Sequence, residues 1–197
     1  MTQTYYAPSH QAEFLRTLFS HLTDSLIELR LINGERSRQF FYEDVEAVIG
    51  ALPDLLTQYD GYNVYVGVCP RSQRDGSKAS IKVAVGLWAD VDGKDFKGGK
   101  AEALQRLQDF PLQPTITTDT GNGGQGIWLF KEPLPIQGEA DITRFEHLNR
   151  RLRQVLNADP AAVDLARVLR VPGTWNVKDA ANPLPARILN LDPTRRY

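Results

Sequence analysis

Two aspartates separated by one residue close an apolar run, and their types and spacing suit metal chemistry. Asp90 and Asp92 end the run SIKVAVGLWADVD, whose odd-numbered residues from Val83 to Val91 form a continuous apolar face if the run is a strand. The two carboxylates then share the opposite face, with Cα atoms about 7 Å apart. Such carboxylates suit Mg²⁺ or Mn²⁺, which prefer oxygen ligands and bridge substrate phosphates. The alternative is a strand end that exposes two acids to water.

A glycine-rich run, TTDTGNGGQGIWLF, is the second candidate. Its glycines Gly121, Gly123 and Gly124 fall between two predicted strands. A P-loop or a dinucleotide fingerprint instead needs a helix directly after its glycines, so neither is predicted. The N–H groups of an open glycine turn can still cup an anion. The simpler interpretation is a hairpin without a ligand.

The third candidate is ADPAAVDLARVLRVPGTWNVK, which gathers acids and bases in one stretch. These residues are Asp159, Asp164, Arg167, Arg170 and Lys178. Residues 144–197 hold ten Lys or Arg against five Asp or Glu, which makes this part +5 and the remainder −6. A basic end beside an acidic centre suits an enzyme that holds phosphates near a carboxylate metal site. A structural salt-bridge cluster around Asp164 is the alternative.

The composition limits the possible classes. Cys69 is the only cysteine among 197 residues, so the chain cannot build a disulfide or a cysteine-ligated zinc site by itself. No apolar run reaches membrane-spanning length, and the first residues lack the basic start and apolar stretch of a signal peptide. We expect one domain over residues 1–197 in the cytoplasm, without a membrane partner.

The hydrophobic patterns predict a mixture of helices and antiparallel strands, hence an α+β class. Asn33-Gly34 between two strand-like runs is a strong hairpin signal. Helices are predicted over residues 11–22, 43–56, 100–108 and 141–156. Strands are predicted over residues 25–32, 63–70, 80–92, 115–120, 126–130 and 186–191, with a basic loop over 71–79.

Taken together and in order, five segments resemble the archaeo-eukaryotic-type primase-polymerases of phages, plasmids and CRISPR-associated systems. These segments are LIELRLI, NVYVGVCPR, GLWADVD, DTGNGGQGIWLF and ADPAAVDLARVLRVPGTWNVK. The resemblance implies an RRM-like antiparallel sheet with flanking helices, joined to an N-terminal α/β unit, with the site in the cleft between them. It also implies template-dependent nucleotidyl transfer, as a DNA primase, a DNA polymerase or both, with two divalent ions, Mg²⁺ or Mn²⁺.

The resemblance also assigns roles to individual residues. Asp90 and Asp92 match the acidic pair that binds the metals, with Asp159 as the first choice for the third carboxylate and Asp164 as the second. The predicted nucleotide and phosphate contacts are Gly121, Asn122, Gly123, Gln125, Arg167, Arg170 and Lys178. Arg71 and Arg74 correspond to a basic loop that contacts the template.

Gln125 departs from the family pattern, which most often has a histidine there. A glutamine amide can donate a hydrogen bond to phosphate but carries no charge. Gln125 therefore leaves open a nucleic-acid-binding module with weak or no catalysis. A metal-dependent nuclease is a further alternative, because paired carboxylates serve hydrolysis as well as transfer. The partners implied are a DNA template or primer-template, NTP or dNTP, and a helicase or helical C-terminal domain that acts in trans or has been removed.

Overall fold

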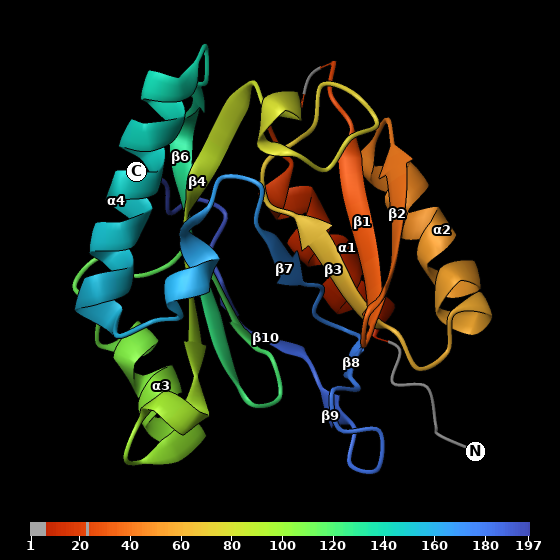
Figure 1. The fold of residues 1–197 in the computed structure, drawn as a ribbon. Helices are drawn as coiled ribbons and strands as arrows, with labels where there is room; N and C mark the ends of the chain where they lie inside the picture. The colour runs from red at the N-terminus through yellow and green to blue at the C-terminus, as the bar shows by residue number, and fades with distance from the viewer. Residues whose placement is uncertain (1–6, 23) are drawn as a thin grey trace.

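The N-terminal half forms a four-stranded antiparallel sheet with helices on one face. The computed structural model describes residues 7–22 and 24–197 (Figure 1). The elements in this half are α1 (Pro8–Leu18), β1 (Ile27–Asn33), β2 (Arg36–Tyr42), α2 (Val45–Gln58) and β3 (Asn63–Gly67). The strand order is β2-β1-β3-β7, in which β7 (Val168–Arg170) returns from the far end of the chain.

The second sheet faces the first and carries its helices on the side away from it (Figure 1). Its elements are β4 (Val83–Asp92), α3 (Gly99–Gln108), β5 (Ile116–Asp119), β6 (Gly123–Pro135), α4 (Glu139–Leu156) and β10 (Arg187–Leu191). The order is β10-β5-β6-β4, again antiparallel throughout. A two-stranded ribbon of β8 (Trp175–Asn176) and β9 (Leu184–Pro185) lies between the sheets. Single 3₁₀ turns are η1 (Lys78–Ser80), η2 (Gly93–Asp95) and η3 (Pro160–Val163).

Local sequence signals account for several element boundaries. The Asn33-Gly34 turn joins β1 to β2 as predicted, and Gly34 supplies the positive φ of +56° that such a turn favours. The α2 helix begins after Asp44, whose carboxylate accepts a hydrogen bond from the Ala47 N–H at 2.7 Å. The α1 helix begins earlier than predicted, with Pro8 in its first turn, where a missing N–H costs nothing.

One hydrophobic cluster contains side chains from both sheets. Leu29 of β1, Leu52 of α2, Trp88 of β4 and Phe145 of α4 are members, each at most 1% exposed. The Trp88 and Phe145 rings pack with centroids 5.3 Å apart, and the Trp88 indole N–H donates to the Ala162 carbonyl at 2.8 Å. Burial of such large side chains stabilises the fold by about 1.5–3 kcal/mol each. This shared core therefore fixes the position of one sheet against the other.

Both faces of the strand that ends at Asp92 are packed, which the sequence alone did not show. Trp88 lies on the predicted carboxylate face, yet it is 1% exposed, so β4 is buried on both faces until Asp90. The alternation along β4 therefore separates two packed surfaces and not core from solvent. The three-residue strand β7 was not predicted, because it is short and its Arg170 lies in a charged stretch without a clear strand pattern.

None of the helices in residues 7–22 and 24–197 is long and apolar enough to cross a membrane. The expectation that the first residues form no signal peptide falls partly on residues 1–6, which lie outside the described residues.

Candidate active site

A cavity of about 290 Å³ opens between the two sheets, where β4 ends and β6 begins. We call it the Asp90 cavity. Its acidic lining residues are Asp90, Asp92, Asp95 and Asp159, and its basic ones are Lys94, Arg170 and Lys178. Tyr65 of β3 and Asn122 of the β5–β6 turn also reach it. Segments far apart in the sequence thus bring both signs of charge to one cavity.

Gln125 lies directly opposite Asp90 in the antiparallel pairing of β4 with β6. Its side-chain Nε2 donates to the Asp90 Oδ2 at 3.2 Å, and Gln125 itself is 4% exposed. Burial raises the pKa of Asp90, and the nearby Asp159 acts in the same direction, whereas the hydrogen bond from Gln125 and the charges of Lys178 and Arg170 oppose the rise. The uncharged glutamine therefore stabilises the ionised form of Asp90 in this structure.

Asp92 is held differently, because a lysine neutralises it. Burial works to raise the pKa of Asp92, but its contacts with Lys94 outweigh this effect, so the pKa lies below its usual range. The Lys94 Nζ lies 2.9 Å from Oδ2, and the Lys94 N–H donates to Oδ1 at 3.2 Å. Asp92 thus stays ionised, with a cation in contact with it.

Asp159 reaches the cavity from the segment that follows α4. The helix ends at Asn157 in the left-handed conformation, with φ of +54°, which turns the chain back toward β4. The Asp159 N–H then donates to the Asp90 carbonyl at 2.8 Å. One oxygen of its side chain accepts from the Ala161 N–H at 2.8 Å and caps η3. This backbone contact fixes the third carboxylate beside the first.

Arg170 is the buried cation of the site, at 3% exposure. It pairs with Tyr65 across β7 and β3, and it donates to the Tyr65 hydroxyl at 2.9 Å and to the Asn63 Oδ1 at 2.7 Å. A third bond runs to the Trp175 carbonyl at 3.2 Å. Burial lowers the pKa of this guanidinium, with Tyr65 and Asp90 opposing. An arginine remains charged under such conditions, so the cavity keeps a fixed positive charge.

The glycine hairpin packs tightly against β4. Gly121 has a φ of +97°, and its N–H donates a hydrogen bond to the Asp119 Oδ1 at 2.7 Å. A Cβ at Gly123 would lie 1.9 Å from the Val91 carbonyl oxygen, so only glycine fits opposite Asp92. The turn presents Asn122 to the cavity, and the Asn122 carbonyl accepts from the Gly93 N–H at 3.0 Å.

The fold of the chain matches solved structures of primases and of a primase-polymerase. The primase-polymerase catalytic domain of cyanophage S-2L superposes with a TM-score of 0.67 and 19% identity, over 96% of this chain and 95% of that one. The chain has the primase-polymerase fold. The primase RepB′ superposes with a TM-score of 0.63 and 15% identity, over 94% of this chain and 58% of RepB′. Its catalytic domain, solved with initiator DNA, matches with the same score and 16% identity, over 95% of this chain and 88% of that one.

Comparisons of sequence find less similarity to known proteins than comparisons of structure do. No family model matches the chain. An uncharacterized protein of Methanocaldococcus jannaschii is 32% identical over 127 residues, which cover 59% of this chain. The chain spans only 9% of the length of that relative.

Within this primase-polymerase fold, the structure separates the predicted site residues into two groups. Those that line the Asp90 cavity are Asp90, Asp92, Asp159, Asn122, Gly123, Gln125, Arg170 and Lys178. Asp164 does not line it, because its carboxylate pairs with Arg167 at 2.6 Å. That pair is the salt-bridge alternative considered for this stretch, and it takes Arg167 away from the predicted phosphate contacts.

Arg71 was predicted to contact the template, but its side chain is not on the surface of the protein. The Arg71 side chain is fully buried, with its NH2 group 2.7 Å from the Glu28 Oε2, and Glu28 is also fully buried. A buried ion pair cannot reach a template without leaving a charge unpaired. Arg74 is exposed and donates to the Phe41 carbonyl at 3.3 Å, outside the Asp90 cavity.

The type of donor atom in the site, but not the spacing of the side chains, suits a hard divalent ion. Asp90, Asp92 and Asp159 offer carboxylate oxygens to one cavity, as Mg²⁺ and Mn²⁺ require. In residues 7–22 and 24–197, no three Asp, Glu, His or Cys side chains lie close enough together to form a ready metal group. In this arrangement Asp92 contacts Lys94, and Asp159 caps η3.

The sequence interpretation missed several lining residues, among them Tyr65, Lys94 and Asn176. Tyr65 and Asn176 stand inside segments that carried the resemblance, but only strand register reveals which of their residues face the cavity. Asn176 donates to the Thr120 carbonyl at 2.8 Å, which ties the ribbon to the hairpin. Lys94 follows directly after the acidic pair, so its position was a usable signal.

Proposed function

We propose that this chain catalyses template-directed nucleotidyl transfer, joining NTP or dNTP to a 3′-hydroxyl as a DNA primase, a DNA polymerase or both. The observation that carries the proposal is the meeting of Asp90, Asp92 and Asp159 with Arg170 and Lys178 in one cavity between two sheets. Carboxylates for metals beside cations for phosphates are what phosphoryl transfer needs. The primase-polymerase fold supports the same function.

Asp90, Asp92 and Asp159 would hold two Mg²⁺ or Mn²⁺ ions. When bound, such ions lower the pKa of an attacking hydroxyl and neutralise the triphosphate and the leaving pyrophosphate. Gln125 keeps Asp90 oriented through its hydrogen bond, and the Asp159 backbone ties the third carboxylate to β4. These two contacts hold the Asp90 side chain and the Asp159 backbone in place, and no side chain acts as a covalent nucleophile.

Arg170 and Lys178 would stabilise the negative charge that develops on the phosphates. Arg170 is held by Asn63, Tyr65 and the Trp175 carbonyl before any substrate arrives. A donor that needs no reorganisation stabilises a transition state more than a mobile one does. Lys178 is exposed at the rim of the cavity and can follow the phosphates.

A DNA partner is part of the proposal. The RepB′ catalytic domain, which shares this fold, was solved with initiator DNA. Backbone contacts from the basic residues near the cavity should make DNA binding weaken as salt increases. Strand initiation on bare template would draw on a helicase or helical domain in trans, so we expect the chain to extend primers better than it starts strands.

The test is primer extension on a primer-template with Mg²⁺ or Mn²⁺. The parent should extend the primer, and a variant with Asp90→Asn and Asp92→Asn should not. Asp54→Asn, an exposed aspartate on α2, is the matched control and should behave as the parent. Equal extension by the double variant and the parent would exclude this site.

A second function, a nucleic-acid-binding module without catalysis, draws on one observation. The Gln125 amide donates to Asp90, and no histidine is among the described residues that line the Asp90 cavity. DNA binding without nucleotide incorporation under either metal would favour this function. Cleavage of single strands without added nucleotides would instead favour a nuclease.

A further inference from the structure

The short segment from Trp175 to Lys178 divides two hollows. Its even-numbered residues, Asn176 and Lys178, line the Asp90 cavity. Its odd-numbered residues, Trp175 and Val177, line a second hollow of about 180 Å³. Because side chains alternate along an extended chain, one segment serves both spaces. We call the second space the Trp175 hollow.

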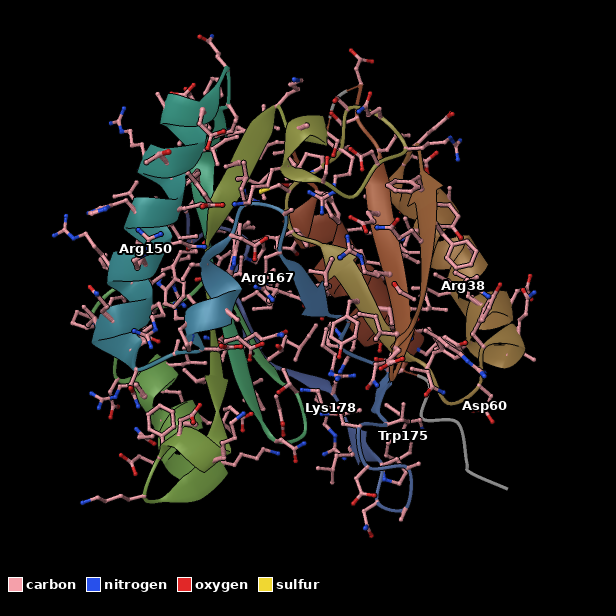
Figure 2. All side chains as sticks on the ribbon, in the orientation of Figure 1. Arg38, Asp60, Arg150, Arg167, Trp175 and Lys178 are labelled. Atoms are coloured by element: carbon pink, nitrogen blue, oxygen red, sulfur yellow. The ribbon has the colours of Figure 1, made fainter. Side chains whose placement is uncertain are left out.

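The Trp175 hollow is lined by both apolar and polar residues. Trp175, Val177 and Pro183 supply the apolar surface, while Asn33 at the β1–β2 turn and Asp60 in the α2–β3 turn supply polar groups. Trp175, Lys178 and Asp60 lie at the same end of the N-terminal sheet (Figure 2). An aromatic ring with apolar and polar neighbours suits a planar ring system that carries hydrogen-bonding groups.

A third hollow of about 420 Å³, which we call the connecting hollow, borders both the Trp175 hollow and the Asp90 cavity. It shares Tyr65 and Lys178 with the Asp90 cavity, and it shares Val177 and Ala180 with the Trp175 hollow. A chain-like ligand in the Asp90 cavity can thus continue past Lys178 to the indole of Trp175. The backbone of Trp175 is tied to the site as well, since its carbonyl accepts from Arg170.

The charges around the Trp175 hollow favour a base over a phosphate. Of the described residues that line it, none is Lys or Arg, and Asp60 is an acid. A carboxylate accepts hydrogen bonds from amino or imino groups of a base edge and repels phosphate. The cation, Lys178, stands where the connecting hollow meets the Asp90 cavity and suits the phosphates of the same strand.

We propose that the Trp175 hollow binds one unpaired nucleobase of the template strand, stacked on the Trp175 indole, next to the Asp90 cavity. The inference rests on the proposed function for its choice of strand. A free nucleotide fits less well, because its phosphates would have to lie beside Asp60 without a cation at hand. Aromatic stacking accepts any base, so the subsite anchors the template without reading its sequence.

The three tryptophans of the chain allow a direct test by fluorescence. Trp88 and Trp128 are 1% and 4% exposed, whereas Trp175 is half-buried and lines the hollow. Titration of the full chain with a short single-stranded DNA should quench the emission of the parent. The Trp175→Phe variant should show no quenching but bind labelled DNA nearly as well as the parent, since phenylalanine still stacks. The Trp175→Ala variant should bind about tenfold more weakly, as expected for one lost base stack.

Two controls separate base stacking from binding through the DNA backbone alone and from loss of the fold. An oligonucleotide with abasic sites in place of its bases should lose the quenching and should bind the parent and Trp175→Ala equally. Thermal unfolding and circular dichroism of Trp175→Ala should match the parent. If this variant is less stable, the abasic comparison on the parent decides the question. Undiminished quenching by the abasic strand, or equal affinity of the alanine variant and the parent for normal DNA, would overturn the inference.

The same samples distinguish failure of this inference from failure of the proposed function. Asp90→Asn should abolish incorporation and leave the fluorescence quenching intact. Quenching by the parent without incorporation would reject the polymerase function and keep a base-binding subsite. Incorporation by the parent with no Trp175-dependent quenching would reject the subsite alone. If a mononucleotide quenches the fluorescence and added single-stranded DNA does not displace it, the inference is also overturned.

Discussion

Replacing Gln125 by leucine tests the most specific contact of the site. The variant keeps the side-chain volume but removes the donor that faces the Asp90 carboxylate. Gln125 itself is 4% exposed, so leucine would occupy the same packed position. The loss of a hydrogen bond to this partly buried charge should lower the free energy of unfolding by about 1.5 kcal/mol.

The size of this loss should depend on pH, because only the ionised carboxylate needs the donor. Burial holds the pKa of Asp90 above its usual range, so Asp90 favours the fold at pH values below its unfolded-state pKa. That contribution is lost as the pH rises through the folded-state pKa. The penalty of Gln125→Leu should therefore be full at mildly alkaline pH and shrink as Asp90 becomes protonated.

Urea unfolding in the presence of a chelator, at mildly alkaline and mildly acidic pH, measures this effect. Gln58→Leu, at an exposed position of α2, is the control and should change stability little at either pH. A Gln125→Leu penalty that is equal at both pH values, or absent at both, would refute the reasoning.

Three further predictions concern the buried charges and the thiol. Arg71→Met should lower the free energy of unfolding by about 3 kcal/mol in urea titrations, because it leaves the buried Glu28 with one partner fewer; an unchanged midpoint would contradict this. Burial raises the pKa of Cys69 to about 12, so a thiol reagent should label it only in urea, and rapid labelling of the native chain would argue against this packing. Arg170→Lys should reduce single-nucleotide incorporation about tenfold, since lysine cannot make the same three bonds, while Arg167→Lys should change it little; equal losses would place both at the site or neither.

Local patterns predicted the elements that depend on neighbouring residues. The Asn33-Gly34 turn and the Asp44 cap depend on backbone preferences over a few positions, and both formed as expected. The acidic pair was found in the same way, because the end of an apolar strand is visible in the sequence. Its setting was not visible, since Trp88 on the same face is buried by α4 and η3.

Long-range pairing decided the remaining features, and no local pattern reports it. Gln125 meets Asp90 because β4 and β6 pair in one register, and a shift by one residue would remove the contact. Asp159 enters the cavity and Asp164 does not, although they are close in sequence, because the left-handed turn at Asn157 directs only the first toward β4. Arg71 belongs to a segment with the composition of a solvent-exposed basic loop, but its side chain is buried against Glu28.

The most direct test of the central claim is incorporation of one complementary nucleotide on a primer-template with Mn²⁺, comparing Asp159→Asn with Asp164→Asn. Asparagine still caps η3, so the comparison removes charge without removing the turn. We expect incorporation by the parent, a loss of about a hundredfold or more in Asp159→Asn, and nearly full activity in Asp164→Asn. No incorporation by the parent, or full activity in Asp159→Asn, would contradict the claim that these carboxylates form a nucleotidyl-transfer site.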